Sequence, residues 1–312
     1  MIDKIMNEAL RKLAENYIGS GVESKQKLLV SNEDAAAGAR SANQLAQTDD
    51  DGLIGRVVSR ISHQEIQNQK NLEDIISLAD QDLACKPDKG DGGEMDEGWF
   101  SYFSKYAMGV TNEEMKKGWA KILAGEIRRP DSFSLRTLNL MSMLSRKEAE
   151  VIRKIAQYVV YTSDEEEAYI LSSKKIEEIE FGDILLLGEL RIIDSSSELS
   201  LNVNRKDEDG FNFLLKNHST GLFFSSEREK MFFRIYKFTT IGKELMKLND
   251  DVELNLDYAK EYAEILIKND PTMTITCSKI LNLTDTNVDL DEEHPYFRIG
   301  KNSEEKEEVS LG

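Results

Sequence analysis

The sequence has few of the residues that build cross-links and metal sites. Its 312 residues include two cysteines, three histidines and four prolines. Cys85 and Cys277 lie far apart and outside any CxxC pair, so the sequence predicts neither a disulfide framework nor a cysteine zinc site, and both cysteines are expected to be free thiols. No run of about 18 apolar residues occurs, and the first residues are amphipathic rather than signal-like. We therefore expect a cytoplasmic protein.

Motifs of common enzyme classes are also missing. His63, His218 and His294 are far apart and form no HExxH pattern, and no GxSxG turn is present. The glycine-rich stretch 86–98 lacks the Lys-Ser or Lys-Thr ending of a phosphate-binding loop. The sequence therefore predicts no catalytic residues, no metal and no cofactor. A hydrolase or nuclease site built from distant carboxylates is left as a separate hypothesis, because it would leave no local pattern.

One acidic cluster near the C-terminus could bind a hard cation. It comprises Asp289, Asp291, Glu292 and Glu293, next to His294. The order of ligands and the central glycine of a calcium loop are absent. We therefore interpret the cluster as part of a solvated, charged tail.

The net charge of −18 is unevenly distributed. Residues 250–312 hold 16 acidic and 6 basic side chains, whereas residues 111–161 hold 10 basic and 6 acidic ones. An acidic protein is repelled by nucleic acid and by anionic membranes, so a general affinity for either is excluded. The basic segment could still form a local binding face, or attract the acidic tail of the same chain.

The first 83 residues contain two amphipathic segments. Met1 to Tyr17 places apolar residues at helical spacing, and residues 31–52 have the composition of a linker or a weakly packed segment. Leu53 to Leu83 is predicted to form one long helix that could bridge domains or pair with a copy of itself. We expect the first segment to dock on the core of the chain or on another subunit through five assembly residues: Ile2, Ile5, Met6, Leu10 and Leu13.

The central region 99–160 is predicted to be helical, with an aromatic core. Capping boxes at Thr111 and Ser145, together with the break at Pro130, predict helices over 111–129, 135–144 and 145–160. The aromatic residues could form a ligand-stacking pocket, but their spacing favours a core: Trp99, Phe100, Tyr102, Phe103, Tyr106 and Trp119. The outer helical faces carry candidate binding residues: Lys117, Lys121, Arg128, Arg129 and Arg136. A plain solvated face is the alternative interpretation of this basic set.

The region 163–270 mixes short strands with helices. The order of helices, a strand pair and a further helix is typical of a winged-helix-like unit. Residues 274–283 suggest a strand, and from Asp285 onward we expect a charged tail, much of it mobile.

Three stretches carry a resemblance to a known family: NQKNLEDII (68–76), WFSYFSKYA (99–107) and residues 113–150, with WAKILAGEI followed by PDSFSLRTL. Over roughly residues 53–268 the chain resembles the bacterial family called domain of unknown function 2806. The stretch Trp119 to Ala124 also resembles the abortive-infection alpha family. The first likeness implies no activity, and the second implies a role in defence against phage.

Together these patterns predict a mainly α protein with a smaller α+β part. We predict four regions: an N-terminal helix and linker (1–52), a helical domain (53–162), a winged-helix-like domain (163–270) and a strand with an acidic tail (271–312). The function predicted is a non-enzymatic cytoplasmic interaction protein, forming a homo-oligomer or binding a partner protein, as a component of phage defence. The alternative is a nucleic-acid-binding module that uses the winged-helix-like unit and the basic helical face.

Overall fold

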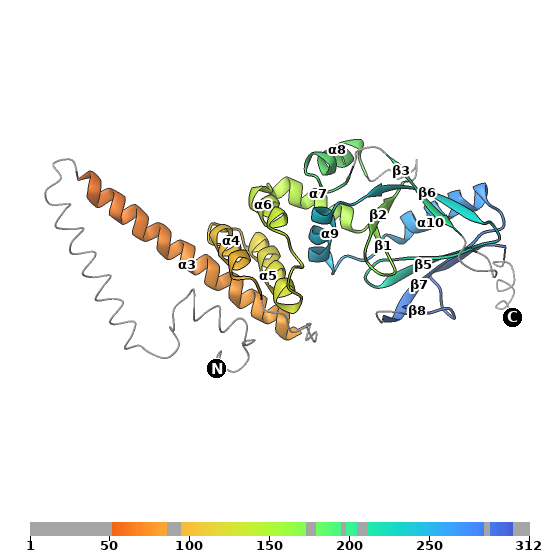
Figure 1. Ribbon diagram of the computed structural model, residues 1–312, viewed down its shortest axis with the longest axis horizontal. Helices are drawn as coiled ribbons and strands as arrows, with labels where there is room; N and C mark the ends of the chain where they lie inside the picture. Colours follow the sequence, from red (N-terminus) through yellow and green to blue (C-terminus); the bar gives the residue numbers. More distant parts are fainter. Residues whose placement is uncertain are drawn as a thin grey trace, which may run out of the picture. The chain divides into compact units, whose positions relative to one another are not determined.

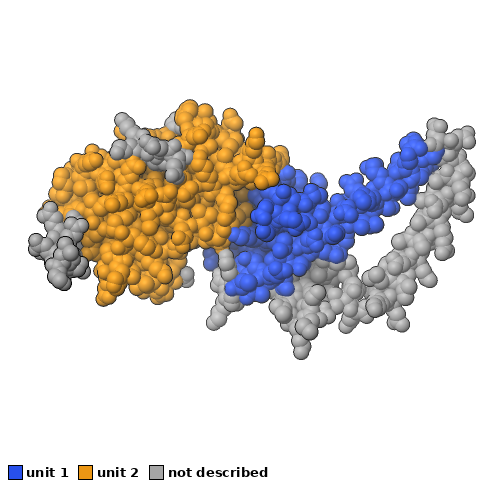
Figure 2. All heavy atoms as spheres, turned by 180° about the vertical axis from the view of Figure 1, so that it is seen from behind, with its two compact units in different colours: residues 1–142 blue, residues 143–312 orange. Residues whose placement is uncertain are grey.

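The computed structural model describes residues 52–85, 95–172, 179–194, 198–204, 211–283 and 288–301. The chain divides into two compact units, Met1–Ser142 and Met143–Gly312, coloured separately in Figure 2. The boundary predicted at residue 162 lies inside the second unit. Among the helices of these described ranges, none is both long and apolar enough to cross a membrane.

The first unit is helical in its described part. It contains α3 (Leu53–Cys85), α4 (Glu97–Ala107), α5 (Glu113–Arg128) and α6, which begins at Leu135 and ends at Met143. The long helix predicted from residue 53 is confirmed, and α3 packs against both α4 and α5, as Figure 1 shows. At 1.5 Å per residue, its 33 residues make a rod about 50 Å long.

The core of this unit is aromatic, as the spacing predicted. The side chains of Trp99, Phe100, Phe103 and Trp119 are at most 6% exposed. The ring of Phe103 lies 5.3 Å from that of Trp99, in a stacked arrangement, and 5.3 Å from that of Trp119, edge to face. These are favourable geometries for aromatic pairs. These four rings therefore fill a core, whereas Tyr102 and Tyr106 are half-buried.

One of the two capping predictions is confirmed and one is wrong. Ser145 and Glu148 form the expected capping box at the start of α7 (Arg146–Ala156). At α5 the cap is Asn112, whose side chain accepts hydrogen bonds from the backbone N–H groups of Glu114 and Met115. Thr111 fits the capping pattern as well, but asparagine one residue later is an equally strong cap, and α5 begins there.

The described part of the second unit is built on an antiparallel sheet of nine strands, which Figure 1 shows. Its strand order is β3-β6-β2-β1-β4-β5-β7-β8, with β9 also paired to β7. The strands are β1 (Val159–Thr162), β2 (Ala168–Leu171), β3 (Leu199–Asn204), β4 (Phe211–Lys216), β5 (Thr220–Ser226), β6 (Lys230–Lys237), β7 (Thr274–Leu283), β8 (Val288–Leu290) and β9 (Phe297–Gly300). With α7, the other helices are α8 (Phe181–Glu189), α9 (Thr240–Met246) with a 3₁₀ turn (Lys247–Asn249), and α10 (Leu256–Asn269).

The coarse prediction of helical and α+β parts is confirmed, but the sheet is larger than predicted. The helix expected over 145–160 ends at Ala156, and Val159 and Val160 belong to β1. The tail expected from Asp285 onward contains β8 and β9, so that prediction is wrong for residues 288–301. Pairing between strands, rather than local composition, determines both differences. Strand β1 pairs with β2 and β4, and β9 forms backbone hydrogen bonds with β7.

Helix α10 is joined to the sheet by a buried tyrosine. The Tyr258 hydroxyl accepts a hydrogen bond from the backbone N–H of Leu171 at 2.7 Å and donates to the carbonyl of the same residue at 3.0 Å. Its ring meets that of Tyr158 edge to face, with centroids 5.1 Å apart. Burial raises the pKa of this phenol well above its usual value. The hydroxyl thus satisfies a backbone pair at the end of β2.

Candidate assembly surface on helix α3

Helix α3 buries one face along its C-terminal half. Leu72, Ile75 and Ala79 are fully buried and Ile76 is 6% exposed. At 100° per residue these positions fall on a single side of the helix, the side that packs against α5. The C-terminal half is therefore an ordinary core helix.

The same face continues over the N-terminal half, where no helix or strand of the described ranges packs on it. Leu53 is 56% exposed, Ile54 39%, Val57 36% and Ile61 47%, and Val58 is half-buried. We call these five residues the α3 stripe. Ile54, Val57, Val58 and Ile61 have the same angular positions as the buried residues further along, and Leu53 lies at the edge of this face. Ile66, which is 63% exposed, points away from it. In Figure 1 this half of α3 extends past α4 and α5.

Polar contacts fix the other half of α3 to its neighbours. Lys116 of α5 donates to the Asp74 carboxylate at 2.7 Å, and the pKa of this lysine is raised mainly by that bond. Arg128 bonds both the carboxylate of Asp82, at 2.9 Å, and its backbone carbonyl, at 2.7 Å. Such paired, partly buried contacts hold a helix in one orientation. They hold the C-terminal half of α3 against α5.

The five predicted basic binding residues have different environments. Lys117 pairs with Glu114 at 2.8 Å on the exposed surface of α5, and Arg128 makes the contacts to Asp82 just described. Lys121 is half-buried, and Arg129 and Arg136 are exposed. Within the described ranges, no ion pair involves Arg129 or Arg136. Arg128 therefore contributes to helix packing, and the two other arginines are the more accessible members of the set.

One buried carboxylate in this unit was missed by the sequence analysis. Glu126 is 1% exposed, and its two carboxylate oxygens accept hydrogen bonds from the backbone N–H groups of Asp131, at 2.8 Å, and Phe133, at 3.0 Å. Asp131 has a positive φ of 64°, which this anchoring helps to maintain. Burial raises the pKa of Glu126. The only sequence signal is an acidic residue on the apolar side of α5, five residues before the turn that follows Pro130.

The assembly residues predicted near the N-terminus lie outside the described residues. These are Ile2, Ile5, Met6, Leu10 and Leu13. Their predicted role in assembly stays a prediction. The α3 stripe is a second apolar surface, which the structure identifies.

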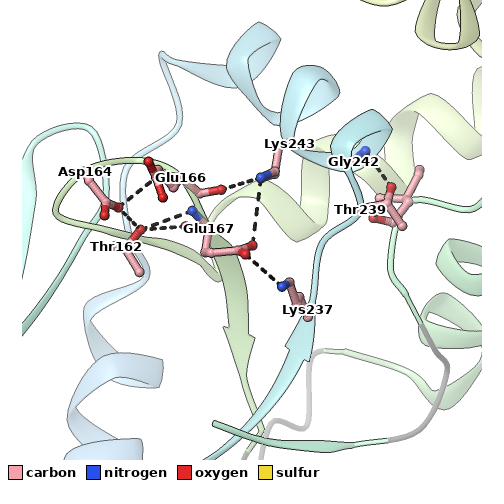
Figure 3. A network of polar contacts seen from close by, with 9 residues as sticks. Thr162, Asp164, Glu166, Glu167, Lys237, Thr239, Gly242 and Lys243 are labelled. Atoms are coloured by element: carbon pink, nitrogen blue, oxygen red, sulfur yellow. Dashed lines mark hydrogen bonds and ion pairs between the residues drawn. The ribbon is translucent and has the colours of Figure 1, made fainter. Parts of the chain in front are cut away.

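A second charged cluster surrounds the acidic turn between β1 and β2 (Figure 3). Lys237 of β6 pairs with Glu167 at 2.8 Å, and Lys243 of α9 lies 3.8 Å from the same carboxylate. Lys243 also donates to the carbonyl of Glu166. A third lysine, Lys216 of β4, is 3% exposed and pairs with Glu165 at 2.6 Å. Three lysines from β4, β6 and α9 therefore balance the negative charge of the turn, and their contacts fix the turn to these elements.

The described residues give no support to a metal centre. No three histidine, cysteine, aspartate or glutamate side chains within these ranges are grouped so that they could hold an ion. His294 pairs with Asp291 at 3.4 Å and is exposed. Cys85 is exposed and Cys277 is buried in β7, where burial raises the pKa of the thiol to about 12. Cys277 is thus a core residue.

The chain belongs to the family described as Protein of unknown function (DUF2806), whose model matches residues 55–264. This match confirms the resemblance carried by the stretches at 68–76, 99–107 and 113–150. No curated protein and no solved structure matches the chain significantly. The matched range includes most of the α3 stripe, all of α5 and the sheet as far as β6.

Proposed function

We propose that this DUF2806 protein is a non-enzymatic, cytoplasmic interaction protein that assembles through the α3 stripe. The observation that carries the proposal is the continuity of one helical face, which is buried against α5 in residues 72–79 and is 36–56% exposed at Leu53, Ile54, Val57 and Ile61. A monomer gains nothing from extending an apolar face beyond its own core. Contiguous exposed apolar surface on a protein marks a site of interaction.

The energetics favour a specific but moderate interaction. Burying a whole Val, Leu or Ile side chain is worth about 1.5 to 3 kcal/mol. Four stripe residues are 36–56% exposed, and Val58 is half-buried. Five such residues contribute about 3 to 7 kcal/mol, and a matching partner contributes a similar amount. Association costs about 4 to 15 kcal/mol in lost freedom. We therefore expect binding that depends on protein concentration in the micromolar range.

The mass of the full chain in solution tests this proposal. Light scattering on the eluting protein, over a hundredfold range of concentration, should give a mass above 35.4 kDa or show a stable complex with a partner protein. Val57→Asp places a charge in the middle of the stripe and should abolish the association. Ile66→Asp makes the same kind of change off the stripe, at a site that is 63% exposed against 36% for Val57, and should leave the association intact. Equal behaviour of the two variants would contradict the proposal.

We extend the proposal to a role in defence against phage. Its support is the short resemblance of Trp119 to Ala124 to the abortive-infection alpha family. Trp119 is fully buried against Phe103, so the resemblance lies in a core segment and concerns the scaffold. A host strain that expresses the chain should show fewer plaques than one without it, and Val57→Asp should remove the protection. An unchanged plaque count across a phage panel would refute this extension.

The second candidate function is nucleic-acid binding. Two observations favour it: the exposed arginines Arg129 and Arg136, and the β4–β5 hairpin beside the helices of residues 163–270, which could serve as a winged-helix-like unit. Against it stand the net charge of −18 and the engagement of Arg128 with Asp82. Binding of DNA or RNA should fall steeply with added salt and be lost in an Arg129→Gln, Arg136→Gln double variant. Absence of binding at low salt would rule it out.

A further inference from the structure

The α3 stripe follows a seven-residue repeat. Ile54 and Ile61 occupy position a and Val57 occupies position d, so these three side chains form the centre of a coiled-coil seam. Leu53 and Val58 occupy the flanking positions g and e. Seven-residue spacing is the pattern by which two helices pack side by side over several turns.

Two unpaired charges stand on opposite edges of this seam. Arg60 is at position g and Glu65 is at position e of the next repeat, five residues later. Both are exposed, and neither takes part in an ion pair within the described ranges. Five residues apart on one helix, they do not face each other. Each is therefore able to pair with an opposite charge on another helix.

The spacing of these charges selects one kind of partner. In a parallel, in-register pair of helices, position g of one chain lies beside position e of the following repeat in the other. Arg60 of each copy then meets Glu65 of the other, and two-fold symmetry makes the contact twice. In an antiparallel pair the like edges meet, which brings position g against position g. Arg60 would then lie on the same side as Arg60 of the other chain, and no carboxylate would be beside it.

Polar residues limit the length of the seam. Gln64 occupies the next d position and Asn68 the next a position. Amide side chains at such positions pair with their own copies and penalise shifted registers. Beyond them, Leu72 and Ile75 turn their apolar face to α5. The pairing thus covers residues 53–68 and leaves the packing of the first unit unchanged.

We propose that the partner of the α3 stripe is a second copy of this chain, paired in parallel and in register, with Arg60 of each copy bonded to Glu65 of the other. This inference rests on the proposed function, because it names the occupant of the same surface. It predicts a dimer with twice the 35.4 kDa mass of the chain.

Disulfide cross-linking of the full chain tests the direction of pairing. Ile54→Cys and Ile61→Cys are made separately in a Cys85→Ser background, since Cys85 is the exposed native thiol. In a parallel pair each new cysteine lies next to its own copy, so each single variant should form a covalent dimer on mild oxidation. An antiparallel pair centred on the stripe would separate the copies of residue 54 by about 10 Å along the axis, beyond disulfide reach.

The cross-linking outcomes are distinct. A covalent dimer in both single variants supports the proposal. A dimer only in a mixture of the two variants overturns it in favour of antiparallel pairing. Ile66→Cys is the control, because Ile66 lies on the outer side of α3 and is more exposed, at 63%, than Ile54 or Ile61. If it cross-links as readily as the seam variants, the dimers are random collisions and the proposal fails.

A charge exchange tests the bond between the copies. Arg60→Glu and Glu65→Arg should each raise the dissociation constant by about three- to tenfold, as expected when an exposed ion pair becomes a repulsion on both sides of the dimer. The double variant should return it to within about twofold of the original value. Lys70→Glu is the control, because it makes the same charge change on α3 away from the seam. Single effects without rescue in the double variant would contradict the Arg60–Glu65 contact.

These results also separate the inference from the proposed function. A chain that stays monomeric but loses a stable partner complex in Val57→Asp would refute the second copy and leave the interaction surface standing. A chain in which Val57→Asp changes neither mass nor partner binding would refute both. Circular dichroism of each variant at the same concentration confirms that α3 is still helical.

Discussion

Replacing Glu126 by glutamine should destabilise the first unit by about 2 to 4 kcal/mol. Both carboxylate oxygens accept backbone N–H groups of the turn after α5, from Asp131 at 2.8 Å and from Phe133 at 3.0 Å. The glutamine side chain keeps one oxygen as an acceptor, but its NH₂ group faces the second backbone N–H group. A buried polar group left without a hydrogen-bond partner costs about 1 to 3 kcal/mol. In the variant two such groups lose their partner: one backbone N–H group and the new NH₂ group.

Tryptophan fluorescence reports this loss selectively. The chain has two tryptophans, Trp99 and Trp119, and both are buried in the first unit. The indole N–H of Trp99 donates to the carbonyl of Phe133 at 2.6 Å, within the turn that Glu126 anchors. Urea unfolding followed by this signal should show a lower midpoint for Glu126→Gln with an unchanged slope.

A matched surface change gives the scale. Glu150→Gln removes an exposed ion pair with Arg146, and pairs of this kind are worth about 0.3 to 0.5 kcal/mol. Because Glu150 lies in the second unit, the tryptophan signal should barely respond. If Glu126→Gln costs less than about 1 kcal/mol, the anchoring role assigned to the buried carboxylate is wrong.

The pH dependence of the same comparison has a definite sign. Burial raises the pKa of Glu126 in the folded chain above its usual value near 4.5. The unfolded chain then loses its proton first, so the stabilisation is complete below about pH 4.5 and is lost as pH rises through the folded pKa. The difference in unfolding free energy between the wild type and Glu126→Gln should therefore shrink as pH rises from 4.5. A difference that grows would contradict the shift.

Three further results are expected. Gly125→Ala should lower the stability of the first unit by about 1 to 3 kcal/mol, because the new methyl group would lie 2.6 Å from the Phe133 ring. Gly182→Ala, in α8 with open space around it, should instead raise the stability of the second unit by up to about 1 kcal/mol. A thiol reagent at neutral pH should label Cys85 rapidly and Cys277 only after unfolding, since Cys277 is buried with a raised pKa; rapid labelling of two thiols in the native protein would refute this.

Local signals in the sequence predicted most elements of the first unit. The break at Pro130 and the long apolar repeat from Leu53 depend on neighbours within four residues, so they can be identified without the fold. The cap of α5 was misplaced by one residue for the same reason, since Thr111 and Asn112 both satisfy the local rule. The basic residues show the limit of this approach. Arg128 looks like a surface cation in the sequence, and only the position of Asp82 on α3 makes it a packing contact.

The larger features depended on contacts between residues distant in the sequence. Strand β9 joins the sheet because β7 presents its edge to it, and a highly charged segment gives no sign of this. Glu126 is a similar case, because its carboxylate acts through hydrogen bonds from the backbone N–H groups of Asp131 and Phe133 in the following turn.

The sequence by itself determined which residues of α3 share a face, because helical periodicity is a property of the local chain. The tertiary structure decided where that face is covered, since burial depends on α5 lying against residues 72–79 and ending short of the stripe. An apolar repeat looks identical whether a neighbour covers it or not. The distinction between core and assembly surface therefore belongs to the fold.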